Sequence, residues 1–242
     1  MVSSKNQDSM RNNFHITLSM QSIRLFMFVG LFASVTVVVC NTILYSYGNI
    51  AFWPQWALNL SYWAGSMVLA FAALGFVPTY FALRPAGQFW AIVTSGFLAY
   101  FVALGSVGHG SFFPYYSILQ AIEVNSKEKI LEDFLVPIQT YNQFLFLVCI
   151  LILLLGSVFY SVLILVKPTI YPKWMAFCNP ALITLPIYLL ASAKDIHPII
   201  RIASNGIGFH LGLSGHFLLT YYFLRQSSEQ KKVRADVKIT TN

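Results

Sequence analysis

Three histidines lie within long apolar stretches of the sequence, and they are the residues best suited to chemistry. His109 lies towards the end of one stretch, and His210 and His216 share another. An imidazole can donate, accept or transfer a proton near neutral pH. Six residues separate His210 from His216, which places them roughly 120° apart around a helix, so one helical face cannot offer both to a metal ion. We therefore expect no metal site and no cofactor.

Small residues surround His109 in the sequence. Gly105, Gly108 and Gly110 are close neighbours, and Ser106 precedes the histidine by about one helical turn. Glycines allow a neighbouring backbone or a ligand to approach an imidazole closely. The pattern predicts that His109 contacts a ligand. The competing interpretation is a solvated histidine at the end of a membrane span.

A polar stripe in another apolar stretch gives two further candidates. Asn41 and Tyr45 are four residues apart, so a helix presents them on one face. A polar residue inside a membrane span is costly unless it is paired, which makes each one a candidate for function. The alternative is a hydrogen bond that holds two helices together. The predicted ligand-binding set is Asn41, Tyr45, Ser106, His109 and His210.

The composition indicates what kind of protein must position these residues. Hydrophobic residues make up 57% of the 242 residues and charged residues 10%, whereas soluble domains carry about 25% charged residues. The fold class is therefore all-α, a polytopic membrane helix bundle. The net charge of +7 is spread in ones and twos beside apolar runs. That distribution is typical of orientation signals and excludes a nucleic-acid groove.

Six apolar segments are long enough to cross a bilayer, which takes about 20 residues. A polar segment, residues 1–22, precedes them, and a basic tail, residues 226–242, follows. In the loop after the third segment, Asn125 and Glu128 resemble a helix cap and precede apolar residues on one face, which predicts a short amphipathic helix. The predicted spans are residues 25–47, 61–83, 89–113, 141–166, 174–191 and 202–224.

The distribution of basic residues predicts the orientation of the six spans. Eleven Lys and Arg residues fall on the side that carries both termini, against four on the other side. Cytoplasmic loops carry the excess of Lys and Arg. We therefore expect both termini in the cytoplasm and the protein in the plasma membrane, as a bacterial inner-membrane protein.

Several short motifs, taken in order, resemble an uncharacterised family of bacterial six-span integral membrane proteins. The resemblance covers about residues 22–225 and implies a six-span bundle without an assigned activity. The family often has an acidic residue where this chain has Asn41, and this difference argues against proton transfer by the first span. The motifs are Arg24-Leu25, Asn41-x-x-Leu44-Tyr45, Gly105-x-x-Gly108-His109-x-Ser111-Phe112, Tyr171-Pro172-x-Trp174-Met175-Ala176 with Asn179-Pro180, and Asn205-Gly206-x-Gly208-Phe209.

Three functions remain open at this point. The first is binding or transport of a small amphipathic or lipid-like molecule in an outer-half pocket near His109, with membrane lipids as the other partners. The second is an integral-membrane enzyme that acts on a lipid or isoprenoid, with His109 as acid or base. The third is a structural or accessory subunit. The enzyme ranks below binding because the sequence offers His109 no carboxylate or metal partner at membrane depth.

Overall fold

The computed structural model describes residues 18–125, 128–183 and 208–240, and within these ranges every regular element is a helix. Four helical stretches are long and apolar enough to cross a membrane: Met20–Tyr45, Gln55–Ala86, Gln88–Val124 and Asp133–Val166. The last three contain the predicted spans 61–83, 89–113 and 141–166, and the first overlaps the predicted span 25–47 without reaching its end. The expectation of an all-helical bundle with membrane-length helices is thus confirmed at that level.

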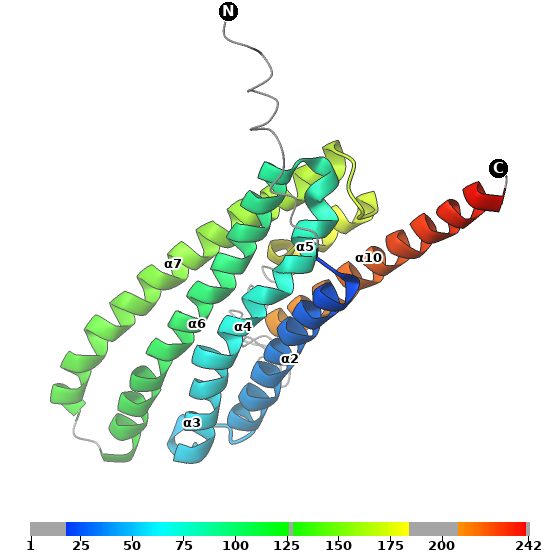
Figure 1. The fold of residues 1–242 in the computed structure, drawn as a ribbon. Helices are drawn as coiled ribbons and strands as arrows, with labels where there is room; N and C mark the ends of the chain where they lie inside the picture. The colour runs from blue at the N-terminus through cyan, green and yellow to red at the C-terminus, as the bar shows by residue number, and fades with distance from the viewer. Residues whose placement is uncertain (1–17, 126–127, 184–207, 241–242) are drawn as a thin grey trace, which may run out of the picture.

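The long helices run side by side (Figure 1). The first is α2 (Met20–Tyr45), and the antiparallel pair α6 (Gln88–Asn125) and α7 (Glu128–Val166) lies across the bundle from it. The last helix, α10 (Gly208–Thr240), packs against α2 and α5 and then continues away from the bundle towards the C-terminus. Helices α2 and α6 terminate, and helices α3 and α7 begin, on the same side of the bundle. We call this side the hairpin end.

The second membrane-length stretch, Gln55–Ala86, which we call the second crossing, consists of short helical pieces. The helical pitch changes twice along it. Its π-helical turn η2 lies near the hairpin end, and its 3₁₀ turn η3 lies further along. π-Helical turns inside α-helices occur frequently at functional sites. The pieces are α3 (Gln55–Trp63), η2 (Ala64–Val68), α4 (Leu69–Ala72), η3 (Ala73–Gly75), α5 (Phe76–Leu83) and η4 (Arg84–Ala86).

The pitch change at η3 coincides with a close contact between helices. A Cβ atom on Gly30 of α2 would lie 2.6 Å from the Cα atom of Gly75, and one on Gly75 would lie 2.5 Å from the Cζ atom of Phe217. Phe217, on α10, is fully buried. A side chain at either position would be overpacked, because Gly30 meets the backbone of Gly75 and Gly75 meets a fully buried aromatic ring.

α6 and α7 pack with a constant antiparallel register. A Cβ atom on Gly156 would lie 3.0 Å from the Cδ2 atom of Leu98, and nearer the hairpin end the Ser111 hydroxyl donates to the Asn142 side-chain oxygen. The residue numbers of each pair add up to nearly the same value. A residue of α6 and a residue of α7 whose numbers add up to that value therefore lie at about the same depth in the bundle.

The structure corrects the expected outer loop. Residues 114–125 continue α6 and residues 128–140 begin α7, so no separate short amphipathic helix forms there. Pro114 and Pro137 both lie inside these helices. Proline is tolerated within membrane helices when neighbouring groups satisfy the freed carbonyls. The predicted third span, residues 89–113, is thus the first part of a longer helix.

The last two predicted spans are described only in part. Residues 173–178 form the 3₁₀ helix η5 (Lys173–Cys178) rather than the start of an α-helix, and a new helical turn covers residues 180–183. The Lys173 ammonium donates to the carbonyl oxygens of Ile164 and Leu165 at 2.5 and 2.8 Å, and so caps the C-terminus of α7. The remainder of the fifth span and residues 202–207 of the sixth lie outside the described residues.

Candidate functional site

His109 lies where α6 meets the π-helical turn of the second crossing. A Cβ atom on Gly65, inside η2, would lie 2.6 Å from the Cβ, Cγ and Nδ1 atoms of His109. The absence of a side chain at position 65 therefore creates the space that the imidazole fills. We call His109, His210 and Gly65 the His109 site.

His210 faces His109 from α10. The two ring centroids are 5.9 Å apart and the ring planes are inclined by 46°. His210 is 2% exposed, and its Nδ1 atom has no hydrogen-bond partner among the described residues. Phe112 packs edge-on against His109 at 6.0 Å, and Phe209 packs against His210 at 5.3 Å. The arrangement is a pair of imidazoles within an aromatic setting.

The other three predicted ligand contacts have partners of their own. Asn41 is buried, and its side-chain oxygen accepts a 2.7 Å hydrogen bond from the Ser61 hydroxyl of α3. This bond is the helix-to-helix alternative considered above. Tyr45 packs edge-on against Trp53 at 5.7 Å. The Ser106 hydroxyl donates to the Ala103 carbonyl oxygen of its own helix at 2.6 Å. These residues do not turn towards the histidine pair for their polar contacts.

The three glycines that neighbour His109 in the sequence do not provide the close contact to its side chain. No described atom lies within 4 Å of a Cβ placed on Gly105, and the nearest atoms to one on Gly108 or Gly110 are 3.6 Å away. Gly65, on the second crossing, provides the contact instead. Sequence reasoning missed it because nothing in the primary structure pairs position 65 with His109. A glycine in the second span, one turn after Ser61, was the only available signal.

A second histidine cluster lies further from the hairpin end, and sequence reasoning did not find it. The Nε2 atom of His216 shares a 3.1 Å hydrogen bond with the Thr79 hydroxyl of α5. Tyr160 of α7 and Tyr171 flank the imidazole, with ring centroids 5.5 and 6.5 Å away. We call the group formed by Thr79, Tyr160, Tyr171, His216 and Thr220 the His216 cluster.

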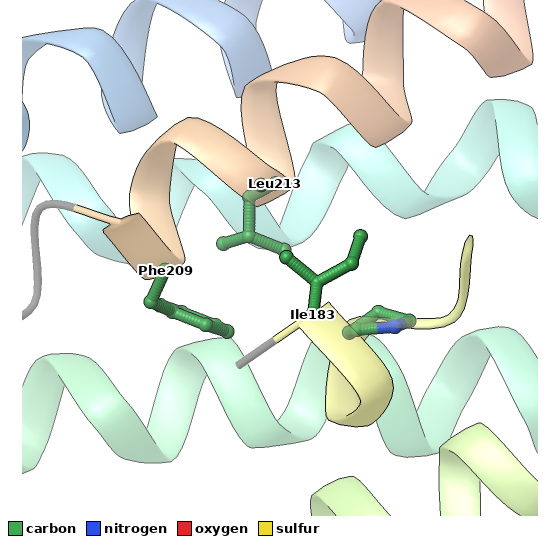
Figure 2. A pocket seen from close by; sticks show the side chains of 5 residues that line it. Ile183, Phe209 and Leu213 are labelled. Carbon is green, nitrogen blue, oxygen red and sulfur yellow. The ribbon is translucent and has the colours of Figure 1, made fainter. Parts of the chain in front are cut away.

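The described residues offer limited chemistry beyond hydrogen bonding. They contain no group of three or more His, Cys, Asp or Glu side chains that could hold a metal ion. A narrow apolar crevice lies beside His210 on α10, between that helix and residues 180–183 (Figure 2). Ile183, Phe209 and Leu213 point into it, and it is too small to hold a water molecule. This crevice is an apolar packing defect, and none of the predicted ligand contacts lines it.

The fold and the site define a helical protein with membrane-length apolar helices and two histidine clusters, each with a buried histidine on α10. The chain belongs to a family of unknown function, DUF6796, whose model matches residues 10–226. This agrees with the resemblance to an uncharacterised family. No curated protein and no solved structure matches the chain.

Proposed function

We propose that this protein is a multi-span integral membrane protein that binds a small amphipathic or lipid-like molecule at the His109 site. The observation that supports this proposal is the pair of imidazoles from α6 and α10, whose ring centroids are 5.9 Å apart. The buried Nδ1 atom of His210 has no hydrogen-bond partner among the described residues. A hydroxyl, carbonyl or phosphate group can pair with such nitrogens. The aromatic rings of Phe112 and Phe209 suit the apolar part of the same molecule.

The depth of the site supports an amphipathic ligand. His109 is the twenty-second residue of α6, so it lies roughly 32 Å along that helix from its start at about 1.5 Å per residue. That distance matches the hydrocarbon thickness of a bilayer, about 30 Å. We infer from the excess of basic residues on the opposite side that the hairpin end faces away from the cytoplasm of a bacterial inner membrane. The headgroup of a lipid in the outer leaflet would then reach the imidazoles.

Thermal unfolding of the detergent-purified chain tests the proposal. The probes are phosphatidylethanolamine, phosphatidylglycerol, palmitic acid and farnesol, each added alone. A molecule that binds only the folded state raises the unfolding temperature. We expect at least one probe to raise it for the natural chain and to do so much less for His210→Gln.

His216→Gln is the matched control, since it changes the same residue type on another face of the same helix. The control should keep the response to the probe. The proposal fails if no probe distinguishes His210→Gln from the natural chain, or if both variants lose the response equally.

The structural alternative has one observation in its favour, which is the tight packing of His109 against Gly65. A purely structural His109 site would give a His210→Gln chain with a lower unfolding temperature and an unchanged response to every probe. The enzyme alternative has less support. Among the described residues, no hydrogen bond or ion pair joins a carboxylate to His109 or His210, and the only ion pair is Arg225 with Glu229.

A further inference from the structure

Two arginines meet at one tyrosine where α2 and α10 lie together, far from the hairpin end. The Arg24 Nε atom, on α2, donates a 2.8 Å hydrogen bond to the Tyr221 hydroxyl of α10. The guanidinium carbon of Arg24 lies 5.8 Å from the centre of the Tyr221 ring. Arg225 follows Tyr221 by four residues, on the same face of α10, and interacts electrostatically with that tyrosine. The two guanidinium groups therefore lie beside the same tyrosine.

Both arginines keep hydrogen-bond donors for a further partner. Among the described residues, each guanidinium donates only through its Nε atom, Arg24 to Tyr221 and Arg225 to the Glu229 carboxylate at 2.7 Å. Their terminal nitrogens have no partner within the same part of the chain. The side chains of Arg225 and Glu229 are 61% and 59% exposed, and such exposed ion pairs contribute little. This pair therefore competes only weakly with an incoming anion.

An apolar track leads from the two arginines towards the middle of the bundle. The contact of Arg24 with Tyr221 and the crossing at Gly30 show that α2 and α10 pack antiparallel, and Figure 1 shows them side by side. A step of four residues along α2 leads from Arg24 to Phe28, and a step of three back along α10 leads from Tyr221 to Leu218. Phe28 and Leu218 are 52% and 49% exposed. Both apolar side chains thus lie one turn deeper than the arginines.

The arginines lie at the depth expected for lipid headgroups. Arg24 is the fifth of the 26 residues of α2, so roughly 32 Å of helix separates it from the hairpin end, at about 1.5 Å per residue. That length matches the hydrocarbon thickness of a bilayer, about 30 Å. Tyr222, beside Tyr221, is 56% exposed, as is typical of aromatic residues at a membrane interface.

We propose that Arg24, Tyr221 and Arg225 bind the phosphate group of an anionic phospholipid in the cytoplasmic leaflet. A guanidinium can pair with two phosphate oxygens at once, and the Tyr221 hydroxyl can donate to a third. An acyl chain of the same lipid covers Phe28 and Leu218, which a free phosphate ion would leave exposed. Anionic lipids of the cytoplasmic leaflet attract basic segments next to a membrane span. This site lies at the other end of the bundle from the His109 site and does not depend on it.

Lipid affinity of the detergent-purified chain, measured by native mass spectrometry, tests the site. The probes are phosphatidylglycerol, which carries a net negative charge, and phosphatidylcholine, which carries none, with identical acyl chains. We expect Arg24→Gln and Arg225→Gln each to weaken phosphatidylglycerol binding about fivefold to tenfold. Phosphatidylcholine binding should not change. Lys167→Gln is the matched control, because it removes one exposed positive charge at the same end of the bundle, just after α7.

The control and a gain of affinity separate a specific site from a general charge effect. Lys167→Gln should change phosphatidylglycerol affinity by less than about twofold. Glu229→Gln removes the carboxylate that holds Arg225 and should tighten binding, a result that misfolding does not produce. Equal losses in Lys167→Gln and Arg24→Gln, or no gain in Glu229→Gln, overturn the site.

Two further measurements identify the ligand and the place where it binds. Glycerol 3-phosphate should not displace phosphatidylglycerol, and displacement would show a site for soluble anions and overturn the assignment to a lipid. His210→Gln separates this site from the His109 site. A loss of affinity confined to the arginine variants supports the proposal whatever the His109 site binds. A loss confined to His210→Gln overturns it and leaves the proposed function standing.

Discussion

The two histidine clusters use their neighbouring hydroxyl groups in different ways. At the His109 site, Ser106 donates to a carbonyl of its own helix, and Ser214 does the same to the carbonyl of His210. In the His216 cluster, Thr79 and Tyr171 form hydrogen bonds to side chains of another element. Hydrogen bonds between elements fix how the helices pack, whereas those within a helix leave the imidazoles available. The first site therefore suits an external ligand, and the second suits fold stability.

Close packing also differs between the two regions. A Cβ atom on Gly65 would meet the side chain of His109, whose imidazole can rotate but whose Cβ atom, also 2.6 Å away, cannot. Gly30, near the His216 cluster, meets the backbone of Gly75, which cannot move without shifting a helix. Glycine thus makes room for a histidine side chain in one region and for a helix crossing in the other.

The largest effect is expected from adding a methyl group at the helix crossing. Gly30→Ala places a Cβ atom 2.6 Å from the Cα atom of Gly75, and overpacking of this kind costs about 3 kcal/mol. We expect a corresponding loss in the free energy of unfolding, measured by denaturant titration in mixed micelles.

Gly65→Ala is the comparison for this prediction. It should also lower the free energy of unfolding, because the new methyl group lies 2.6 Å from the Cβ atom of His109, which rotation of the imidazole does not move. Unlike Gly30→Ala, it should also abolish the response to the lipid probes. A Gly65→Ala chain that keeps the probe response would contradict this comparison.

The second prediction compares the hydroxyl groups of the two clusters. Thr79→Val leaves the buried Nε2 atom of His216 without its partner, at a cost of roughly 1–3 kcal/mol. Ser106→Ala removes a hydroxyl that bonds only its own helix and should change the free energy of unfolding by less than about 0.5 kcal/mol. Both values come from the same denaturant titration. A larger loss for Ser106→Ala than for Thr79→Val would reverse the comparison.

The third prediction concerns the bond between α2 and α3. The Ser61 hydroxyl donates to Asn41 at 2.7 Å, and hydrogen bonds between membrane helices contribute about 0.6–2 kcal/mol. A double-mutant cycle with Asn41→Leu and Ser61→Ala should give a coupling energy in that range. A coupling energy near zero would free Asn41 for the ligand-contact role that its position in the sequence predicts.

Most of the helical framework can be predicted from the sequence because long apolar runs have few alternatives in a bilayer. The start of the first helix was missed by five residues: the predicted span begins at residue 25, whereas α2 begins at Met20 after Ser19, whose hydroxyl accepts from the Ser22 amide at 3.1 Å. The ends of α6 and α7 could not be predicted, because Pro114 and Pro137 are read locally as helix breakers. The packed pair carries both helices past these residues.

The candidate site was predictable in its histidines but not in its surroundings. His109 and His210 were identified separately by their position in apolar runs, and the structure brings their rings together. The contact with Gly65 and the bond between Thr79 and His216 each join different helices. Such pairings depend on helix register and rotation, which the periodicity of a single sequence does not determine.

The smallest effect is expected at Gly105, which the sequence offers as a point of close approach to His109. The sequence suggested that Gly105 admits a close neighbour to His109, but no described atom lies within 4 Å of a Cβ placed there. Alanine also favours a helix over glycine by up to about 1 kcal/mol. Gly105→Ala should therefore raise the free energy of unfolding by a few tenths of a kcal/mol to about 1 kcal/mol, with the probe response unchanged. Because Gly105→Ala and Gly65→Ala add the same methyl group on either side of His109, opposite signs for their stability changes would locate the close packing at η2 and not on α6. A loss of stability in Gly105→Ala would instead restore the glycines of α6 as the surface that a neighbour approaches.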